Sequence, residues 1–588
     1  MIKAIAQMGN YSTVGSDALD IYTTKYNLKS YPQSLVVNIN TIESKWDVFI
    51  EENTKKSARK HLYKKGPPNG AGPTPNAMIT KTILGTFESK MLAWFEKYTK
   101  ESKGNTIELF TICKEILFGY KQEIIDKLKE KSQGKNNFAL ILMINSKYLS
   151  EVEEFVNYFL SKLTFDDSCD SSKNGLTCSV CNVNKSNIID SPNYFKFYTI
   201  DKEGFIIGGF NEIRNKSNYP VCQDCEKKII KGLELIKQHL EFNFYGFKYK
   251  IIFRSITGNQ NNLNELIDSF ADAEKRIKIS NKYKGSTIAR EDDLLAFIKD
   301  EKDHFAIDLL FIEELKAGAV QKIVLHIHDV LPSRLRKIFE AKSKTDAVFS
   351  RDGEFKFTFG NIWEFFNKSD SEKNKNDLAN YFFEIVNSVF VGKPIEFTFL
   401  AQFYMLRIRK EFLTNDNDNQ FIYTSKNAQK VTKFFNCLNI LKHNSENYMA
   451  NYDFFNEFLS DYGEQLDSPE KKGVFFLGAL VEQMLYTQKS SRNADPFWEK
   501  LKSLKMGQTD FLGLLSQTTE KMHQYDKLYS SDKLLIQIIS DNFLRSSKIW
   551  KISVDELNYL FVAGMSMQYQ IYSIINQYLS SQSNKENQ

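Results

Sequence analysis

Cys178-Ser179-Val180-Cys181 and Cys222-Gln223-Asp224-Cys225 are two Cys-x-x-Cys pairs about forty residues apart, and they contain four of the seven cysteines of the chain. The spacing predicts a tetrahedral zinc site, because two such pairs supply four thiolates to one ion. Four cysteines close the coordination shell, whereas a catalytic zinc keeps one position open for water. We therefore expect a structural zinc and look for the function elsewhere.

Disulfide or unligated cysteines are the alternative to a zinc site. The cysteine count is odd, and residues 1–10 lack the apolar region of a secretory signal peptide. We therefore expect reduced thiols and a cytoplasmic protein. Cys113 and Cys437 lie in apolar helical contexts typical of core positions, and Cys169 is an alternative ligand that lacks a second cysteine at Cys-x-x-Cys spacing.

Length and composition indicate a globular protein with several domains. A chain of 588 residues exceeds what one hydrophobic core supports, and its 42% hydrophobic and 26% charged residues are ordinary. No apolar run approaches the roughly eighteen residues needed to cross a bilayer. The net charge of +5 permits nucleic acid as a partner without requiring it.

The most basic part of the chain precedes a stretch, Gly66 to Pro75, that contains four of the eleven prolines. Residues 55–65 can form a helix on which Lys56, Lys60 and Lys64 share one face. The Gly/Pro stretch predicts a loop whose backbone can approach a phosphate or a base edge closely. Phosphate contact is one interpretation, and a solvated helix followed by a linker is the other. The basic residues are Lys55, Lys56, Arg59, Lys60, His61, Lys64 and Lys65.

Hydrophobic patterns predict strands and helices on both sides of the cysteine pairs. Residues 138–144 are expected to form a buried strand, followed by a helix over residues 151–163. Alternation at residues 194–200 and 205–210 predicts a hairpin between the pairs, and a helix over residues 227–240 is expected to begin at the second pair. Metal ligation would hold this region together, because its own core is thin.

Further strands are expected at residues 242–256, 306–312 and 323–329. In the last of these, His326 and His328 face the same side and precede Asp329. Such a group can bind a metal or transfer protons, but partly exposed strand histidines are more common, and no further ligand cluster lies nearby in sequence. The chain has no Gly-rich phosphate loop, Ser elbow or His-Glu-x-x-His motif, so we do not expect an enzyme.

Beyond residue 330 the pattern is mainly helical, with polar joints at residues 368–377 and 414–420. Ser468-Pro469 matches an N-cap with proline at the first helical position, and three more helices follow, the last with a capping box at Ser553 and Glu556. Residues 468–580 are therefore expected to form a helical bundle. Its basic connections suit either a solvated surface or single-strand phosphate contacts, and they include Lys500, Lys502 and Lys505.

Five segments occur in the following order along nearly the whole chain: Met1 to Ile5, Tyr63 to Gly66 leading to Thr74-Pro75, the two cysteine pairs, Asp329 to Leu335, and Gly473 to Gly478. Together they resemble the large subunit of type I-B CRISPR interference complexes (Cascade). This resemblance implies a non-catalytic subunit of an RNA-guided antiviral surveillance complex. Guide RNA pairs with target DNA, while this subunit recognises the protospacer-adjacent motif in the duplex and aids strand opening.

The resemblance also implies partners and site residues. The partners are guide CRISPR RNA, target double-stranded DNA, the backbone, 5′-handle-binding and small subunits, and a recruited helicase-nuclease, with no membrane and no cofactor beyond structural zinc. A separate small subunit from an internal start at Met449 would contain the whole bundle. We expect phosphate contacts from Lys55, Lys56, Arg59, Lys60, Lys64 and Lys65, base-pair approach by Asn69, Gly70 and Gly72, and strand-opening contacts from Lys500, Lys502 and Lys505.

The expected fold class is α+β, with a mixed multi-domain N-terminal region, a zinc-stapled hairpin insertion and an all-α C-terminal bundle. The expected regions are a mixed α/β domain with the basic Gly/Pro loop (1–165), a zinc-binding insertion (166–240), a mixed and then mainly helical middle (241–466) and the bundle (467–588). One alternative function is a zinc-stabilised nuclease or nucleic-acid-processing enzyme that uses His326, His328 and Asp329. A structural scaffold is another.

Overall fold

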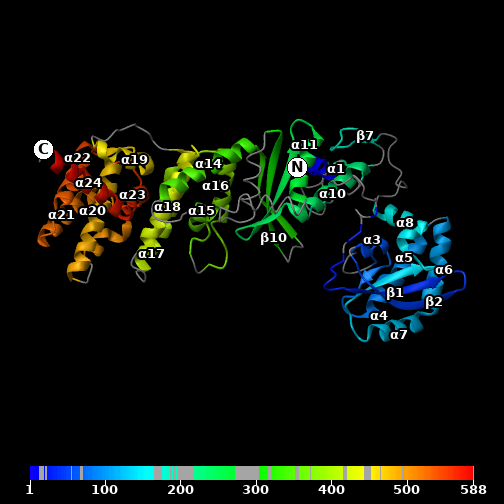
Figure 1. The fold of residues 1–588 in the computed structure, drawn as a ribbon. Helices are drawn as coiled ribbons and strands as arrows, with labels where there is room; N and C mark the ends of the chain where they lie inside the picture. The colour runs from blue at the N-terminus through cyan, green and yellow to red at the C-terminus, as the bar shows by residue number, and fades with distance from the viewer. Residues whose placement is uncertain are drawn as a thin grey trace. The chain divides into compact units, whose positions relative to one another are not determined.

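The computed structural model divides the chain into two compact units, one made mainly of residues 1–240 and the other mainly of residues 241–588 (Figure 1). The structure describes residues 1–11, 19, 23–24, 26–54, 56–65, 71–102, 104–163, 175–185, 188–189, 194–195, 218–271, 303–315, 320–350, 356–370, 373–414, 420–442, 452–463, 465–492 and 496–586.

The first unit contains a five-stranded sheet of order β2-β1-β4-β3, in which β5 also pairs with β4. β1 runs parallel to β4, with Val36 opposite Ile141, and antiparallel to β2. Every residue of β4 is buried, as expected for a strand that is covered on both faces. The strands are β1 (Gln33–Asn40), β2 (Lys45–Glu52), β3 (Ala77–Met78), β4 (Phe138–Ile144) and β5 (Lys147–Tyr148).

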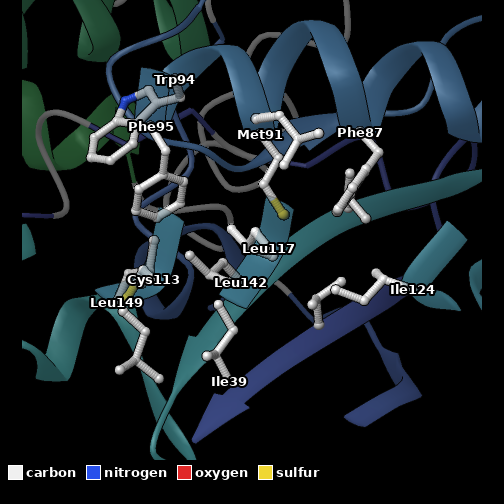
Figure 2. Close-up of a cluster of buried hydrophobic side chains, with 14 of the residues drawn as sticks. Ile39, Phe87, Met91, Trp94, Phe95, Cys113, Leu117, Ile124, Leu142 and Leu149 are labelled. Atoms are coloured by element: carbon white, nitrogen blue, oxygen red, sulfur yellow. The ribbon is translucent and has the colours of Figure 1, made fainter. Parts of the chain in front are cut away.

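The main core of this unit lies between one face of the sheet and a layer of helices. Figure 2 shows Phe87, Met91 and Phe95 from the helical layer above Leu142 and Ile39 of the strands. A smaller cluster around Val36 and Ile141 covers the opposite face. The helices are α1 (Ile2–Tyr11), α3 (Ser57–Lys60), α4 (Ile83–Thr86), the π-helical η1 (Phe87–Leu92), α5 (Ala93–Glu101), α6 (Asn105–Gly119), α7 (Lys121–Ser132), the 3₁₀ turn η2 (Leu149–Glu151), α8 (Glu153–Leu163) and α10 (Gln223–His239).

The second unit contains a four-stranded sheet of order β11-β10-β9-β8. Aromatic side chains join the sheet to a helix, since Phe244 stacks on Phe382 and Phe311 meets Phe383 edge to face. A separate two-stranded parallel sheet pairs β12 with β13. The strands are β8 (Glu241–Phe244), β9 (Phe247–Ser255), β10 (Phe305–Leu315), β11 (Val320–Val330), β12 (Ile395–Glu396) and β13 (Leu441–Lys442).

The rest of the second unit is helical, and its C-terminal part is a bundle (Figure 1). The helices before the bundle are α11 (Gln260–Ala271), whose residues 263–267 are assigned to the first unit, α14 (Pro332–Phe349), α15 (Phe359–Phe366), α16 (Ala379–Val391), α17 (Phe397–Thr414), α18 (Gln420–Cys437), η5 (Asp453–Phe455) and α19 (Asn456–Tyr462). Those of the bundle are α20 (Pro469–Arg492), η6 (Pro496–Leu504), α21 (Gln508–Gln524), α22 (Ser530–Arg545), α23 (Val554–Ser566) and α24 (Gln568–Glu586).

Two glycines let the backbones of α20 and α23 touch at the centre of the bundle. A Cβ added to Gly478 would lie 1.9 Å from the carbonyl oxygen of Phe561, and one added to Gly564 would lie 1.8 Å from that of Phe475. No side chain fits at either position without moving a helix. Residues 473–478 are one of the segments that carry the CRISPR resemblance, and they contain Gly478, one of the two glycines at this helix crossing.

Several sequence-based predictions are confirmed. The strand at residues 138–144 is β4, the helix at the second cysteine pair is α10, and α20 begins at Pro469 as expected. Ser553 caps α23 by accepting a hydrogen bond from the backbone N–H of Glu556. The mixed α+β class with a helical C-terminal region is also confirmed.

Other predictions need correction. The single strand expected at residues 242–256 is a hairpin, because Tyr245 and Gly246 both adopt positive φ and reverse the chain between β8 and β9. α24 was not expected as a separate helix. Most of the predicted 194–210 hairpin, Met449 and Cys169 lie outside the described residues. Among the described helices, none is both long and apolar enough to cross a membrane.

We predict that Gly564→Ala destabilises the bundle by about 1–3 kcal/mol or more, because the new methyl group forces α23 away from Phe475 of α20. Hydrogen exchange of peptides from α20 and α23 measures this effect. Gly513→Ala in α21 is the matched control, since its Cβ meets nothing closer than 3.9 Å. The control should stabilise α21 by roughly 0.5–1 kcal/mol, because alanine favours helix. Equal protection in the two variants would contradict the close crossing.

Candidate nucleic-acid interface and four-cysteine site

Cys178, Cys181, Cys222 and Cys225 converge on one point, with all four sulfur atoms within 4.8 Å of one another. The Sγ atoms of Cys181 and Cys222 are 4.0 Å apart, which is too far for a disulfide bond. Tetrahedral zinc with Zn–S bonds of about 2.3 Å would place its sulfurs roughly 3.8 Å apart. The four residues therefore fit a metal ion with tetrahedral thiolate coordination.

The backbone around the cysteines explains how two distant segments form one site. The first pair follows β6 (Leu176–Thr177), which forms a short antiparallel ladder with β7 (Asn184–Lys185). The second pair begins α10, and an isolated bridge joins Cys222 to Ile188. Burial raises the pKa of the Cys178 thiol, but backbone N–H donors, including that of Cys222 at 3.3 Å, bring it down to about 7. These donors favour the thiolate that a metal requires.

The remaining described cysteines stand apart from this site. Cys113 is fully buried in the main core of the first unit, where burial raises its pKa to about 12, and Cys437 is partly buried at the end of α18.

Helix α10 connects the four-cysteine site to the rest of the first unit. Its backbone touches that of α1, because a Cβ on Gly9 would lie 1.8 Å from the carbonyl oxygen of Lys228, and one on Gly232 would lie 2.0 Å from that of Ile5. Glu226, in the first turn of α10, interacts electrostatically with Lys64. Burial raises the pKa of Glu226 to about 7, and Lys64 partly offsets this increase.

The basic segment folds differently from the predicted helix. Helix α3 covers only Ser57–Lys60, because the chain turns at Leu62, whose φ is 50°, and buries His61 completely. Lys56, Lys60 and Lys64 therefore do not share one helical face. Lys56 and Arg59 are exposed, and Lys64 is half-buried. Lys55 lies outside the described residues, as do Asn69 and Gly70.

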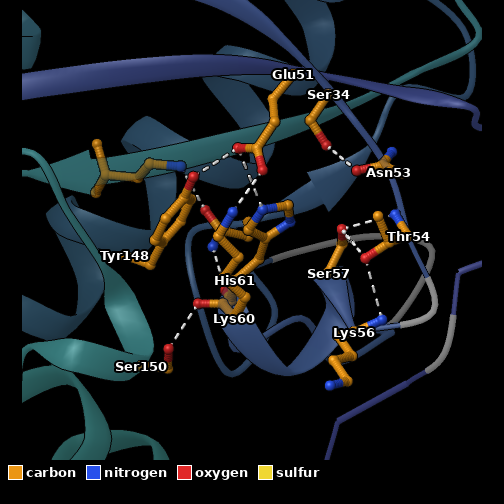
Figure 3. Close-up of polar contacts among 12 residues, drawn as sticks. Ser34, Glu51, Asn53, Thr54, Lys56, Ser57, Lys60, His61, Tyr148 and Ser150 are labelled. Atoms are coloured by element: carbon orange, nitrogen blue, oxygen red, sulfur yellow. Dashed lines mark hydrogen bonds and ion pairs between the residues drawn. The ribbon is translucent and has the colours of Figure 1, made fainter.

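Lys60 belongs to a polar network around Glu51 (Figure 3). Its Nζ lies 2.6 Å from one carboxylate oxygen of Glu51, the hydroxyl of Tyr148 donates to the other at 2.8 Å, and the ammonium lies 3.8 Å from the centre of the Tyr148 ring. Burial raises the pKa of Glu51, but these hydrogen bonds outweigh it and hold that pKa below its usual value. The network fixes α3 against β2, so Lys60 is engaged in structure.

Lys64, Lys65 and Gly72 line a cleft of about 890 Å³ together with residues that the sequence did not single out. Lys81 and Lys90 are two of these. The described lining residues include four lysines and no aspartate or glutamate. Hydroxyl and amide side chains and the aromatic rings of Tyr31 and Tyr63 complete the lining. A cleft with this lining favours an anionic ligand that also offers hydrogen-bonding edges and flat surfaces.

The end of the Gly/Pro stretch is anchored beneath this cleft. The hydroxyl of Thr74 donates to the carbonyl of Leu62, at 3.1 Å. The side-chain amide of Asn76 donates to the carbonyl of His61, and its oxygen accepts the backbone N–H of Leu142 on β4 at 2.8 Å. The loop therefore returns to the sheet at a fixed point, with Gly72 on the cleft wall.

The other candidate residues lie in the second unit. Lys500, Lys502 and Lys505 are exposed at the η6 turn, where Lys502 forms an ion pair with Asp510. His326 and His328 lie on β11, as predicted. The carboxylate beside them is Asp308 of the adjacent strand rather than Asp329, which forms an ion pair with Arg254. The sequence analysis missed Asp308, because it lies on a different strand and is far from the two histidines in the sequence.

Family comparison covers the chain in three blocks. Residues 1–161, 175–330 and 357–577 match the N-terminal, central and C-terminal domains of CRISPR-associated protein TM1802. The chain belongs to the CRISPR-associated TM1802 family. This membership confirms the CRISPR association expected from the sequence and agrees with a large subunit of a type I system. No curated protein matches the chain.

We predict that Cys222→Ser removes a bound metal ion from this family member, because three thiolates hold zinc more weakly than four. Elemental analysis of the purified chain should give about one zinc per chain for the original sequence and a clear loss in the variant. Cys437→Ser is the matched control, since Cys437 lies outside the cluster, and it should keep the zinc. Absence of zinc from the original chain, or its retention in both variants, would contradict the site.

We predict that His61 makes the first unit less stable in mild acid. Burial lowers the pKa of His61 from 6.5 to about 4, so between these values the unfolded chain binds a proton that the folded chain does not. The contribution of His61 therefore lowers stability as pH decreases through this window, by up to about 3 kcal/mol at its lower end, while protonation of Glu226 acts in the opposite direction. Pulse proteolysis in urea, with peptides from residues 26–163 as the readout, measures the effect.

His61→Gln is the control for this pH dependence, because glutamine still offers Tyr26 a hydrogen-bonding group but does not titrate. Glu226, whose pKa is raised to about 7, also takes up a proton in this range but does so in both proteins. The difference between their slopes from pH 6.5 to pH 4.5, a range that stays above the lowered pKa of Glu51, therefore isolates His61. The same slope in both proteins would show that another group is responsible.

Proposed function

We propose that this chain is the large subunit of a type I-B CRISPR surveillance complex and that the cleft of the first unit binds target DNA beside the protospacer. The observation that supports this most directly is the set of four lysines, without any acidic side chain, among the described lining residues. DNA carries negative phosphate charge along its whole length, so a positively charged cleft attracts it and binds its backbone. Family membership supplies the CRISPR context.

Each type of lining side chain has a part in the proposed contact. Lys65 and Lys81 are exposed and hold phosphates, which positions the duplex without reading its sequence. Hydroxyl groups such as those of Thr80 and Ser89 can form hydrogen bonds to phosphates or to base edges. Hydrogen bonds to base edges in the grooves allow a protein to read the sequence of an unopened duplex. Guide RNA would read the remaining sequence by pairing.

The Gly/Pro loop would supply the base contacts. Lys65 and Gly72, which are described on either side of residues 66–70, both line the cleft, and the chain that follows Gly72 is anchored through Thr74 and Asn76. Under this proposal Asn69 and the backbone of Gly70 approach the flanking base pairs. Lys55, Lys56, Arg59 and Lys64 add phosphate contacts, and Lys60 holds α3 in place through Glu51.

The remaining parts of the proposal concern the complex. We propose that Lys500, Lys502 and Lys505 contact the strand displaced during opening, because exposed lysines on a bundle connection suit single-strand phosphates. The four-cysteine zinc is structural, the subunit breaks no bond itself, and a recruited helicase-nuclease degrades the DNA. The guide RNA, the other subunits of the complex and the target duplex are its partners.

We predict that Lys65→Ala combined with Lys81→Ala weakens DNA binding by the assembled guide complex about tenfold or more for every flanking sequence. The slope of log K against log salt should become shallower by about 1.8, because each lost phosphate contact on a duplex accounts for about 0.9. Fluorescence anisotropy with labelled duplexes at several salt concentrations measures both quantities.

Lys147→Ala is the matched control, since Lys147 is an exposed lysine on β5 of the first unit and does not line the cleft. It should leave affinity and slope almost unchanged. Asn69→Ala should instead change the preference among flanking motifs with little effect on the slope. If the double variant bound DNA as tightly as the original complex, the cleft would not be the binding site.

A further inference from the structure

Asp308, His326 and His328 form a second cluster of metal-ligand side chains, in the second unit. The three ligand atoms lie within 4.8 Å of one another. Asp308 comes from β10 and the two histidines from β11, which is the adjacent strand of the sheet. Alternate residues of a strand share a face, so His326 and His328 lie on the same side, and their ring centres are 3.6 Å apart.

The cluster has a buried end and an open end. Asp308 is 2% exposed, the side chain of His326 is 18% exposed, and His328 is exposed. Because Asp308 is buried and His328 is exposed, the site is closed at the carboxylate and open to solvent at the imidazole of His328.

The buried end contains a nitrogen atom without a hydrogen bond. Among the described residues, Nε2 of His326 is shielded from solvent and has no hydrogen-bond partner. It lies 3.8 Å from Oδ2 of Asp308, which is beyond hydrogen-bonding distance. Two metal–ligand bonds of about 2.0–2.2 Å each span this separation, so a metal ion between the two atoms would contact both.

Neighbouring groups orient the carboxylate. The backbone N–H of Asp329 donates to Oδ1 of Asp308 at 3.1 Å, which leaves Oδ2 directed at the histidines. Asp329 itself is held by an ion pair with Arg254 of β9. Hydrogen bonds that fix a liganding carboxylate in this way are typical of metal sites.

We propose that Asp308, His326 and His328 bind a divalent transition-metal ion at an open site. Two imidazoles and one carboxylate suit zinc, cobalt, nickel or iron(II), and two nitrogen ligands disfavour magnesium and calcium. Three protein ligands on one side leave coordination positions for water or for an anionic group of a partner molecule. This site differs from the four-cysteine site in ligand type and openness, and it does not depend on the proposed function.

Cobalt(II) titration of the full chain, purified with zinc in its four-cysteine site, tests the proposal. Calorimetry should show one further equivalent of cobalt, and visible absorption should show weak bands of a nitrogen and oxygen site without the intense bands of cobalt–thiolate bonds. His328→Gln should reduce this affinity about tenfold or more. The variant suits the test because His328 is exposed, so its loss removes no core packing.

His523→Gln is the matched control, since His523 is an exposed histidine on α21 outside the cluster, and it should bind cobalt like the original chain. Zinc content and circular dichroism establish that both variants are folded. Asp308→Asn provides a second loss from the buried end. Binding of cobalt with equal affinity by the original chain and His328→Gln, or no binding beyond the zinc already present, would overturn the proposal.

Discussion

The first unit depends on the convergence of four cysteine sulfurs. Thiolates within 4.8 Å of one another repel, so a cation that neutralises them also fixes the two segments that carry them. One segment opens α10, and α10 packs backbone to backbone against α1 through Gly9 and Gly232. Glu226, one residue after the last cysteine, faces Lys64 at the proposed DNA cleft. A metal ion held by these cysteines would therefore also help to determine where Lys64 lies, although its closed shell leaves no position for a reaction.

The lysines of the first unit divide into structural and proposed binding groups. Lys60 is held by Glu51 and Tyr148, and the partly buried pair adds stability to α3. Lys65 and Lys81, in contrast, are exposed on a cleft whose described lining has no carboxylate. A negatively charged partner in the cleft would gain favourable electrostatic energy from Lys65 and Lys81 together. Counting basic residues along the sequence could not separate the two groups, because the pairing carboxylate of Lys60 lies on another element, β2.

The sequence predicts local structure well where one pattern is decisive. The apolar run at residues 138–144 is β4, and α20 begins at Pro469, directly after Ser468. Features that depend on tertiary contact were missed. β1 and β2 were not identified, although Leu35, Val37 and Ile39 alternate towards the core. Lys81 and Lys90 reach the cleft only because the chain folds back after the Gly/Pro stretch, and Asp308 meets the histidines only through strand pairing. The glycines at the helix crossings gave no periodic signal, since their role is to have no side chain.

The location of the DNA is the central claim, and site-specific photo-crosslinking tests it most directly. A photoreactive amino acid at Thr80, an exposed residue of the cleft, would be placed in the complete complex with guide RNA and a target duplex. The account predicts crosslinks to the base pairs that flank the protospacer and fewer crosslinks when that flanking motif is changed. Crosslinks to guide RNA alone, or none to DNA under conditions in which the complex binds its target, would contradict it.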